Sequence, residues 1–238
     1  MKPQALAIRA HELASILETF GEQFPELEAQ TQRTETGSAH LIEFKDEGQA
    51  SFFMGLLEGV RELLYFAPRE HIEGDENFRQ LLPYVLAHGP NEGSVLGYNR
   101  PGKGQGESRL QGAFSIGFGG HVELKDWRPG QSVGGMLSAC ADRELAEELG
   151  VNACQQVPAL PSALLVDNTN LVGRVHLGLV YQTYVRGDFD VDSSEVENLV
   201  WLRMDEIKAG DKTKVQNPEN WTAMLLGLPL PGVISNDS

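Results

Sequence analysis

Apolar residues recur at helical spacing in two stretches near the start of the chain, residues 4–20 and residues 49–64. A short apolar run between them, at residues 39–44, predicts a strand. From this pattern we predict that residues 1–75 form an N-terminal helical extension. Residues 76–238 are then predicted to form one larger domain, on which the extension packs.

The larger domain mixes short apolar runs with longer amphipathic stretches. An amphipathic stretch at residues 133–149 predicts a helix that stops at Gly150, and residues 205–209 and 221–226 predict short helices. Because strands and helices mix without strict alternation, we predict an α/β fold of mixed α+β character, with a mixed sheet between helices. The short runs typical of strands are residues 81–87, 94–98, 114–118, 162–166, 174–185 and 199–203.

The composition restricts the partners of the chain. It has 34 acidic and 19 basic residues, a net charge of −15, which repels nucleic-acid phosphates and suits divalent cations. We therefore expect no duplex nucleic acid as a partner. No apolar run approaches the roughly 20 residues that cross a bilayer, and the first residues lack a secretion signal, so we expect no membrane contact. Cys140 and Cys154 form no metal-binding pattern, and we expect a cytoplasmic protein.

One segment near the middle of the chain concentrates acidic residues. Glu144, Glu147 and Glu148 are spaced i, i+3 and i+4 in the predicted helix, which places them on one face. That face continues the apolar stripe of Leu137 and Cys140, so the carboxylates are expected to point inward, where an unpaired charge is costly. Clustered carboxylate oxygens are the ligands that hard divalent cations prefer. The pattern favours a metal site, and a solvated acidic face stays the alternative.

The same segment carries a family motif. Nudix hydrolases contain the box G-x5-E-x7-R-E-U-x-E-E-x-G-U, where U is a bulky aliphatic residue, and residues 143–151 resemble its second half at every defined position. Residues 119–123, Gly-Gly-His-Val-Glu, resemble its opening at the end of a predicted strand. The resemblance covers about residues 80–205. It implies a Nudix-like α/β/α sandwich and hydrolysis of a diphosphate linkage.

The first half of the box departs from the family pattern. Gly135 stands eight residues before Arg143, where the box has a glutamate, and Gly120 lies nine residues further from Arg143 than the pattern allows. In the family that glutamate mainly braces the arginine and the loop. Glu123 and Asp126, inside the insertion, are the two candidates for this role. The chain thus resembles an extended subgroup with a Gly-Gly-His opening and a longer loop.

The resemblance also implies roles for the residues of the box. Glu144, Glu147 and Glu148 would bind Mg²⁺ or Mn²⁺ with help from the carbonyl of Gly119, and Arg143 would hold the glutamates in place. The metal would neutralise the diphosphate and lower the pKa of a bound water. A carboxylate would then take the proton of that water as it attacks phosphorus.

The general base is left open between the box glutamates and a later loop. Glu195 and Glu197 precede the last predicted strand and are the loop candidates, and a solvated loop acid is the alternative for each. Our predicted catalytic residues are therefore Arg143, Glu147, Glu148 and Glu195.

Basic residues are concentrated in a Gly-rich loop before the box. Arg100, Lys103 and Arg109 are candidates to receive substrate phosphates, and a solvated loop is the alternative. His121 lies beside the expected metal site and is a further candidate for substrate binding, with a structural histidine as the alternative.

Together these features predict a metal-dependent hydrolase that cleaves the diphosphate linkage of a nucleoside diphosphate linked to another moiety. The expected partner is a small nucleotide-derived diphosphate, and a homodimer is expected because members of the family often dimerise. The competing hypothesis is a non-catalytic Nudix-like module that binds a nucleotide or a partner. Three crowded carboxylates favour the enzyme, because a binding module has little use for them.

Overall fold

The computed structural model describes residues 3–89, 91–102, 110–150, 156–186, 189–211 and 213–231. Its strands are β1 (Gln4–Arg9), β2 (Gln30–Thr34), β3 (Gly37–Glu43), β4 (Tyr65–Pro68), β5 (Phe78–His88), β6 (Ser94–Asn99), β7 (Phe114–Ser115), β8 (Gly117–Phe118), β9 (Ala163–Asp167), β10 (His176–Tyr184) and β11 (Glu197–Arg203). Its helices are α1 (Ala10–Gln23), α2 (Glu47–Gly59), α3 (Arg69–Ile72), α4 (Val133–Leu149), α5 (Met204–Lys208) and α6 (Asn220–Leu226), with short 3₁₀ turns η1 (Arg61–Leu63), η3 (Leu124–Asp126) and η4 (Gly173–Val175).

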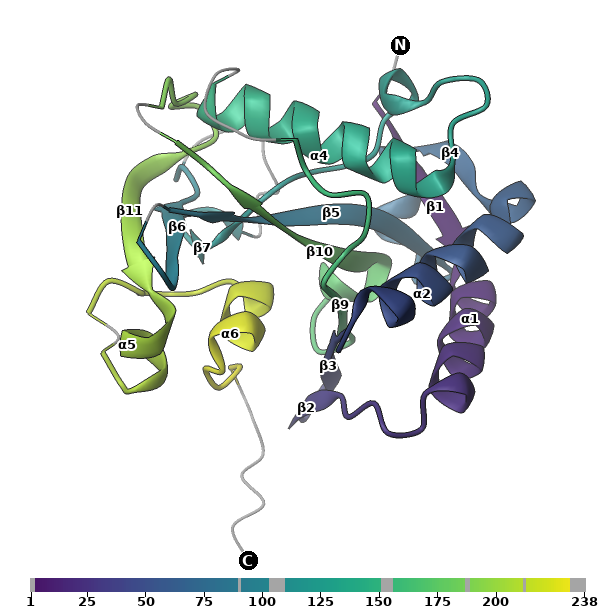
Figure 1. The fold of residues 1–238 in the computed structure, drawn as a ribbon, viewed down its shortest axis with the longest axis horizontal. Coiled ribbons are helices and arrows are strands. Elements are labelled where there is room, and N and C mark those ends of the chain that lie inside the picture. Colours follow the sequence, from purple (N-terminus) through teal and green to yellow (C-terminus); the bar gives the residue numbers. More distant parts are fainter. Residues whose placement is uncertain are drawn as a thin grey trace, which may run out of the picture.

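The strands form one mixed sheet around β5 (Figure 1). Its main path runs β11-β6-β5-β10-β9-β3-β2, while β1 pairs with β5 and β4, β8 with β5, and β7 with β6. β5 and β10 are parallel, and the other named pairs are antiparallel. The mixed sheet predicted from the sequence is therefore confirmed.

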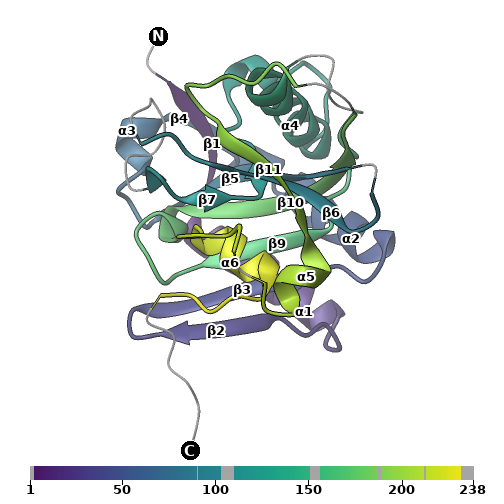
Figure 2. The same cartoon turned by 90° about the vertical axis from the view of Figure 1, so that its left-hand side faces the viewer.

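Helices cover both faces of this sheet, as Figures 1 and 2 show. One core cluster joins α1, α2 and α4 to one face, and a second joins α5 and α6 to the other. Side chains alternate along β5, so that Leu81 and Val85 enter the first cluster and Tyr84 and Leu86 enter the second. A strand buried on both faces reads as a continuous apolar run, which is how the sequence presents β5.

The helix predicted at residues 133–149 is confirmed as α4. The side chain of Ser132 caps its start by accepting the N–H of Gly135 at 3.1 Å. Gly150 ends it with φ +93°, a conformation that favours glycine. Within the described residues, no helix is long and apolar enough to cross a bilayer.

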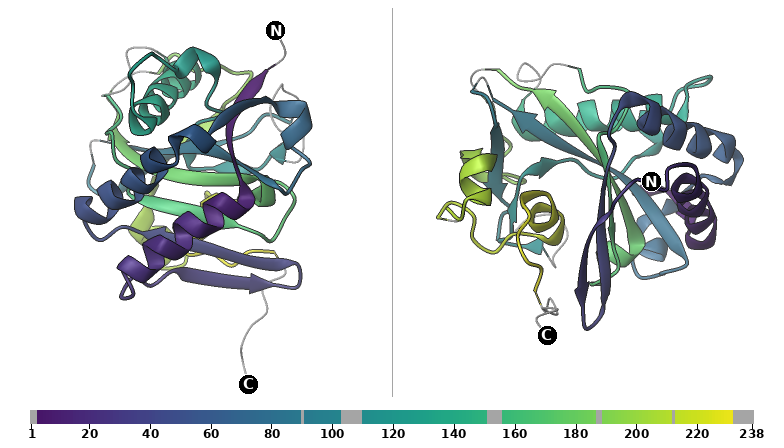
Figure 3. Two further views of the ribbon diagram at one scale, coloured as in Figure 1. Left: turned by 90° about the vertical axis from the view of Figure 1, so that its right-hand side faces the viewer. Right: turned by 60° about the horizontal axis from the view of Figure 1, so that its bottom comes forward.

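The first 75 residues are not the purely helical extension that apolar spacing predicts. They do contain α1 and α2, which lie side by side in Figure 3, and β3 confirms the strand predicted at residues 39–44, but they also contain β1, β2 and β4. β1 pairs with β5 and β3 pairs with β9, so this segment completes the central sheet. The helical description is corrected accordingly, and a domain boundary near residue 75 stays a prediction.

The prediction of a helix at residues 4–9, which form β1, is wrong for a physical reason. In β1, Leu6 and Ile8 face the helices α1 and α2, whereas Ala5 and Ala7 pack against Ile72 of α3. A short apolar run that is buried on both faces cannot be distinguished from a buried helix by periodicity alone.

Candidate active site

Two glycines allow the loop that follows β8 to lie close to both the sheet and α4. A Cβ atom at Gly119, where φ is +151°, would lie 2.1 Å from the carbonyl oxygen of Pro83 on β5. A Cβ atom at Gly120 would lie 2.6 Å from Oε1 of Glu144. A side chain at Gly119 would therefore push the loop off the strand, and one at Gly120 would displace the Glu144 carboxylate. The Gly-Gly opening thus lies directly against the acidic segment.

The three glutamates of α4 do not share one environment. Glu148 is 6% exposed and the side chain of Glu144 is 15% exposed, whereas 54% of the Glu147 side chain is exposed. The inward direction predicted from the sequence is therefore confirmed for Glu144 and Glu148 and is wrong for Glu147. Successive helical residues lie about 100° apart, and the buried Leu145 and Leu149 lie on the flank of Glu148.

One oxygen of the buried Glu148 carboxylate has no partner among the described residues. This oxygen, Oε2, forms no hydrogen bond there, while the N–H of Gly119 donates to the same carboxylate. Burial raises the pKa of Glu148 well above its usual value; the charge of Arg100 opposes this rise, and the charges of Glu144 and Glu195 add to it. A buried acceptor without a partner costs about 1–3 kcal/mol, and a bound cation would remove that cost.

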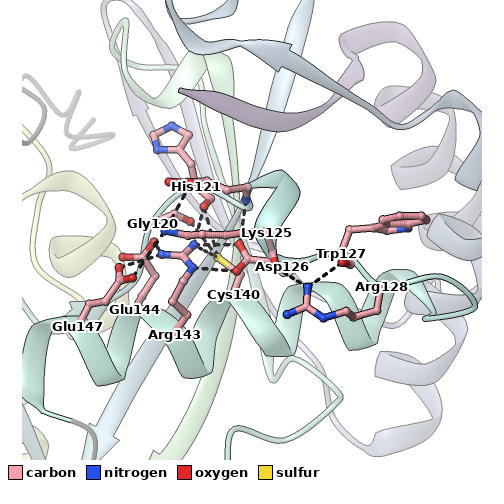
Figure 4. A network of polar contacts seen from close by, with 11 residues as sticks. Gly120, His121, Lys125, Asp126, Trp127, Arg128, Cys140, Arg143, Glu144 and Glu147 are labelled. Atoms are coloured by element: carbon pink, nitrogen blue, oxygen red, sulfur yellow. Dashed lines mark hydrogen bonds and ion pairs between the residues drawn. The ribbon is translucent and has the colours of Figure 1, made fainter. Parts of the chain in front are cut away.

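Arg143 occupies the centre of the site and uses its whole guanidinium within the protein (Figure 4). Its Nε and Nη2 donate to the two carboxylate oxygens of Asp126 at 2.8 and 2.9 Å. Its Nη1 donates to Glu144 at 2.6 Å and Glu147 at 3.0 Å, and Nη2 also reaches the carbonyl of His121 at 3.1 Å. Burial would lower the pKa of Arg143, but the hydrogen bonds to Asp126 and the charge of Glu144 raise it.

Asp126 takes the bracing position that the missing box glutamate leaves open. It lies in the 3₁₀ turn η3, and 3% of its side chain is exposed. Its Oδ2 also accepts the N–H of Glu123 at 2.8 Å, which closes the turn. The carboxylate of Glu123, the other candidate, instead pairs with Lys125 at 3.4 Å. Of the two candidates, the structure therefore brings Asp126 to Arg143.

The imidazole of His121 points away from the glutamates (Figure 4). Its Nε2 lies 3.3 Å from Nε2 of His176 on β10, and the main-chain carbonyl of His121 accepts from Arg143. Burial, together with the nearby charges of Arg69 and Arg143, lowers the pKa of the His121 ring. These contacts support the structural alternative, and substrate binding by His121 stays a prediction.

The loop before β11 brings Glu195 to the end of α4. Asp192 donates its N–H to the carbonyl of Glu148 at 3.2 Å, and Glu195 follows in the same turn. Burial and the charge of Asp192 raise the pKa of the half-buried Glu195, whereas the charge of Arg100 opposes the rise. Glu197 lies exposed on β11. Of the two later acids considered as a base, Glu195 is therefore the one drawn toward Glu148.

Of the three basic residues predicted to bind phosphate, the structure describes Arg100. Lys103 and Arg109 lie outside the described residues, whereas Arg100 directly follows β6. The Nε of Arg100 donates to Glu219 at 2.9 Å, and its guanidinium carbon lies 5.8 Å from the ring centre of Tyr98. Sequence reasoning missed Glu219, because a single acid before a short helix carries no motif.

A divalent cation fits part of this site. Among the described residues, no group of three or more His, Cys, Asp or Glu side chains is arranged to hold a metal. The buried Glu148 and the partly buried Glu144 nevertheless lie one helical turn apart beside the Gly-Gly loop, and in the described part of the chain Oε2 of Glu148 has no partner. Glu147 is paired with Arg143 at 3.0 Å and Lys125 at 3.6 Å. Glu144 also pairs with Arg143, at 2.6 Å, but its side chain is 15% exposed against 54% for Glu147. The residues therefore fit a hard cation bound chiefly by Glu148 and Glu144.

Known proteins resemble this chain in sequence. A family model of the NUDIX domain matches residues 93–225, more than half of the chain. Protein YmaB of Bacillus subtilis (strain 168) is 34% identical over 145 residues, which are 60% of this chain and 68% of YmaB.

Solved structures resemble it in fold. The crystal structure of Tm1382, described as a Nudix hydrolase, has a TM-score of 0.62 and 19% identity, and the match covers 94% of this chain and 96% of that one. The MutT protein from Methanosarcina mazei Go1 has a TM-score of 0.41 and 18% identity over 62% of this chain and 89% of that one. With the NUDIX match across residues 93–225, the mixed α/β sandwich and the acidic helix beside the Gly-Gly loop have one explanation: the chain belongs to the Nudix family and is a Nudix-type hydrolase.

Proposed function

We propose that the chain hydrolyses the diphosphate linkage of a nucleoside diphosphate joined to another moiety, with Mg²⁺ or Mn²⁺ as cofactor. The observation that carries this proposal is Oε2 of Glu148, a buried carboxylate oxygen that has no partner among the described residues and lies one turn from the partly buried Glu144. Nudix hydrolases generally use divalent metal ions and act on small nucleotide-derived compounds. Glu144 and Glu148 would hold the ion, with the carbonyl of Gly119 as a further oxygen donor.

The other residues of the site have supporting tasks in this proposal. The bound ion would supply charge neutralisation and a more acidic water. Arg143, fixed by Asp126, sets the direction of the Glu144 carboxylate through their 2.6 Å hydrogen bond. Glu147 adds negative charge beside the site, and its ion pair with Lys125 makes its contribution to metal binding the smallest of the three.

Glu195 is the proposed general base. A base works best when its pKa lies near the working pH, and burial raises the pKa of Glu195 in that direction. It would take the proton of the water that attacks phosphorus. Arg100 would receive a phosphate oxygen of the substrate, because it directly follows β6 and its charge acts on both Glu148 and Glu195.

A substrate panel tests the reaction. Nucleotide sugars, dinucleotides, nucleoside triphosphates and non-nucleotide diphosphates are incubated with Mg²⁺ or Mn²⁺, and release of phosphate or of a nucleoside monophosphate is measured. We expect Glu148→Gln to lower turnover by roughly 10³-fold or more, and Glu147→Gln to lower it less, because Glu148 has a buried oxygen without a partner in the described structure whereas Glu147 is exposed. Unchanged turnover in Glu148→Gln would overturn the assignment.

A matched pair of variants tests the base. Glu195→Gln is expected to lower kcat by about 10²- to 10⁴-fold and to remove the acidic limb of the pH profile. Glu197→Gln makes the same chemical change two residues away on the exposed strand, and little loss is expected from it. Equal losses in the two variants would exclude Glu195 as the base.

A further inference from the structure

A buried carboxylate lies on the face of the sheet opposite α4, at the start of α6 (Figure 2). Glu219 is 5% exposed at its side chain, and both of its carboxylate oxygens have partners. Its Oε1 accepts from the hydroxyls of Tyr84 and Ser115, each at 2.7 Å, and Oε2 accepts from Nε of Arg100 at 2.9 Å. The hydroxyl of Thr222 lies 2.9 Å from that of Tyr84 and extends the cluster. Because its oxygens are occupied, Glu219 is suited to hold a side chain and not to bind a substrate.

The side chain that Glu219 holds keeps part of its donors free. Among the described residues, the guanidinium of Arg100 forms its hydrogen bond through Nε, and neither Nη1 nor Nη2 has an acceptor. The side chain of Arg100 remains 23% exposed, and the ring of Tyr98 lies along it. Two parallel N–H groups at the end of a guanidinium match two oxygens of one phosphate group.

Arg100 also lies within electrostatic reach of the proposed metal site. Its charge opposes the rise in the pKa of both Glu148 and Glu195. An arginine free to rotate would be attracted to these carboxylates and would compete with a cation for them. The hydrogen bond from Nε to Glu219 restricts this rotation, and among the described residues Oε2 of Glu148 has no partner.

We propose that Glu219 is a positioning residue: it holds Arg100 through Nε, so that Nη1 and Nη2 stay available to bind a phosphate group of the substrate. This inference rests on the proposed diphosphate hydrolysis. It assigns the segment before α6 to the active site, although no box residue lies there. Tyr84 and Ser115 support the arrangement by fixing the other oxygen of Glu219.

A double-mutant cycle separates positioning from a structural role. Glu219→Gln keeps the size of the side chain but removes its charge, and we expect KM for the diphosphate substrate to rise roughly 10- to 100-fold while kcat changes less. Arg100→Ala should raise KM similarly. In the Arg100→Ala background, adding Glu219→Gln should change KM less than about twofold, because Glu219 acts through Arg100. Effects that multiply in the double variant would overturn the proposal.

A binding measurement keeps this test independent of hydrolysis. Inorganic pyrophosphate is titrated into the whole protein and followed by the side-chain N–H signals of arginine in NMR spectra. We expect the Arg100 signals to shift in the unmodified protein, and the affinity to fall by a similar factor in Glu219→Gln. Asp205→Asn, which alters the exposed Arg203 pair at 3.0 Å, is the matched control and should leave the affinity unchanged.

The outcomes distinguish the two proposals. If no diphosphate in the panel is hydrolysed but pyrophosphate still binds in a way that depends on Glu219 and Arg100, the reaction assignment fails and the positioning role stands. If pyrophosphate binds equally to the unmodified protein, Glu219→Gln and Arg100→Ala, the positioning role fails whatever the panel shows.

Discussion

Two arginines of this protein are each held by a nearly buried carboxylate, and they are held differently. Asp126 binds Arg143 through both Nε and Nη2, and the remaining donor, Nη1, goes to glutamates of α4. Glu219 binds Arg100 through Nε alone, and 23% of the Arg100 side chain is exposed against 16% for Arg143. The first guanidinium is fully used inside the protein, whereas the second keeps two donors at its end.

This difference shows how one kind of ion pair can serve two purposes. A guanidinium whose donors are all satisfied internally stabilises the fold, and its loss leaves a buried charge without a partner. A guanidinium held through one nitrogen is preorganised for a ligand, because little freedom remains to be lost on binding. Substitution of Asp126, the bidentate partner of Arg143, should therefore be most visible in unfolding, and substitution of Arg100 in substrate affinity.

The largest expected effect on stability is at the first pair. Asp126→Ala should lower the free energy of unfolding by about 3–5 kcal/mol, because Arg143 would stay buried without its bidentate partner. Urea unfolding measures this loss. Lys125→Ala, at a half-exposed neighbour, is the control and should cost less than about 0.5 kcal/mol. A small loss of unfolding free energy in Asp126→Ala would show that the Asp126–Arg143 pair does not stabilise the fold.

The second pair should contribute less to stability. Arg100→Ala is expected to lower the free energy of unfolding by about 1–3 kcal/mol, because Glu219 retains the hydroxyl donors of Tyr84 and Ser115. The same urea experiment measures it. A loss as large as that of Asp126→Ala would mean that the two arginines have the same structural role.

Glu148 extends this comparison, because among the described residues no arginine donates a hydrogen bond to its Oε2. Burial raises the pKa of Glu148, so the metal-free native protein holds a proton there that the unfolded chain releases above about pH 4.3. The contribution of Glu148 to stability is therefore present at acid pH and is lost as the pH rises above that value. In chelator, Glu148→Gln should be about 1–2 kcal/mol more stable than the unmodified protein at pH 7, with no gain at pH 4.

Thermal or urea unfolding across this pH range, at constant ionic strength, measures the difference. A gain that stayed constant from pH 4 to pH 7 would show that the Glu148 carboxylate is not the titrating group.

The smallest effect on stability is expected at Glu147, the exposed partner of Arg143. Glu147→Gln should change the free energy of unfolding by less than about 0.5 kcal/mol, because its pair with Arg143 is half exposed and screened by solvent. Urea unfolding at low and high salt checks this. A larger loss that disappears at high salt would show that Glu147, and not Asp126 alone, holds Arg143.

The sequence predicts best those elements whose pattern is locally complete. The helix at residues 133–149 has a cap, an apolar face and a terminal glycine, and it is confirmed. The strand β2 has the sequence QTQRT and is mostly exposed at the end of the sheet path, so no apolar alternation marks it. β1 fails for the opposite reason, because both of its faces are buried. Burial on one side produces the patterns that sequence reasoning detects.

The residues of the candidate site also differ in how well the sequence predicts them. The box motif identifies Arg143, Glu144 and Glu148 because they are close together in the chain. It leaves Glu123 and Asp126 as alternatives, since the path of an insertion is not encoded in spacing. Glu219 lies 119 positions from its partner Arg100, and only the fold brings the two together. Assembly into a homodimer stays a prediction, which light scattering would test.

The pairing of β1 with β5 has a practical consequence for anyone who wishes to shorten this protein. A fragment beginning at residue 76 would retain the box but would expose the backbone groups of β5 that now bond to residues 7–9. It would also uncover the apolar surface beneath α1 and α2. An unpaired strand edge beside exposed apolar surface associates with other copies of the same chain. Such a fragment is therefore expected to aggregate before it can be assayed.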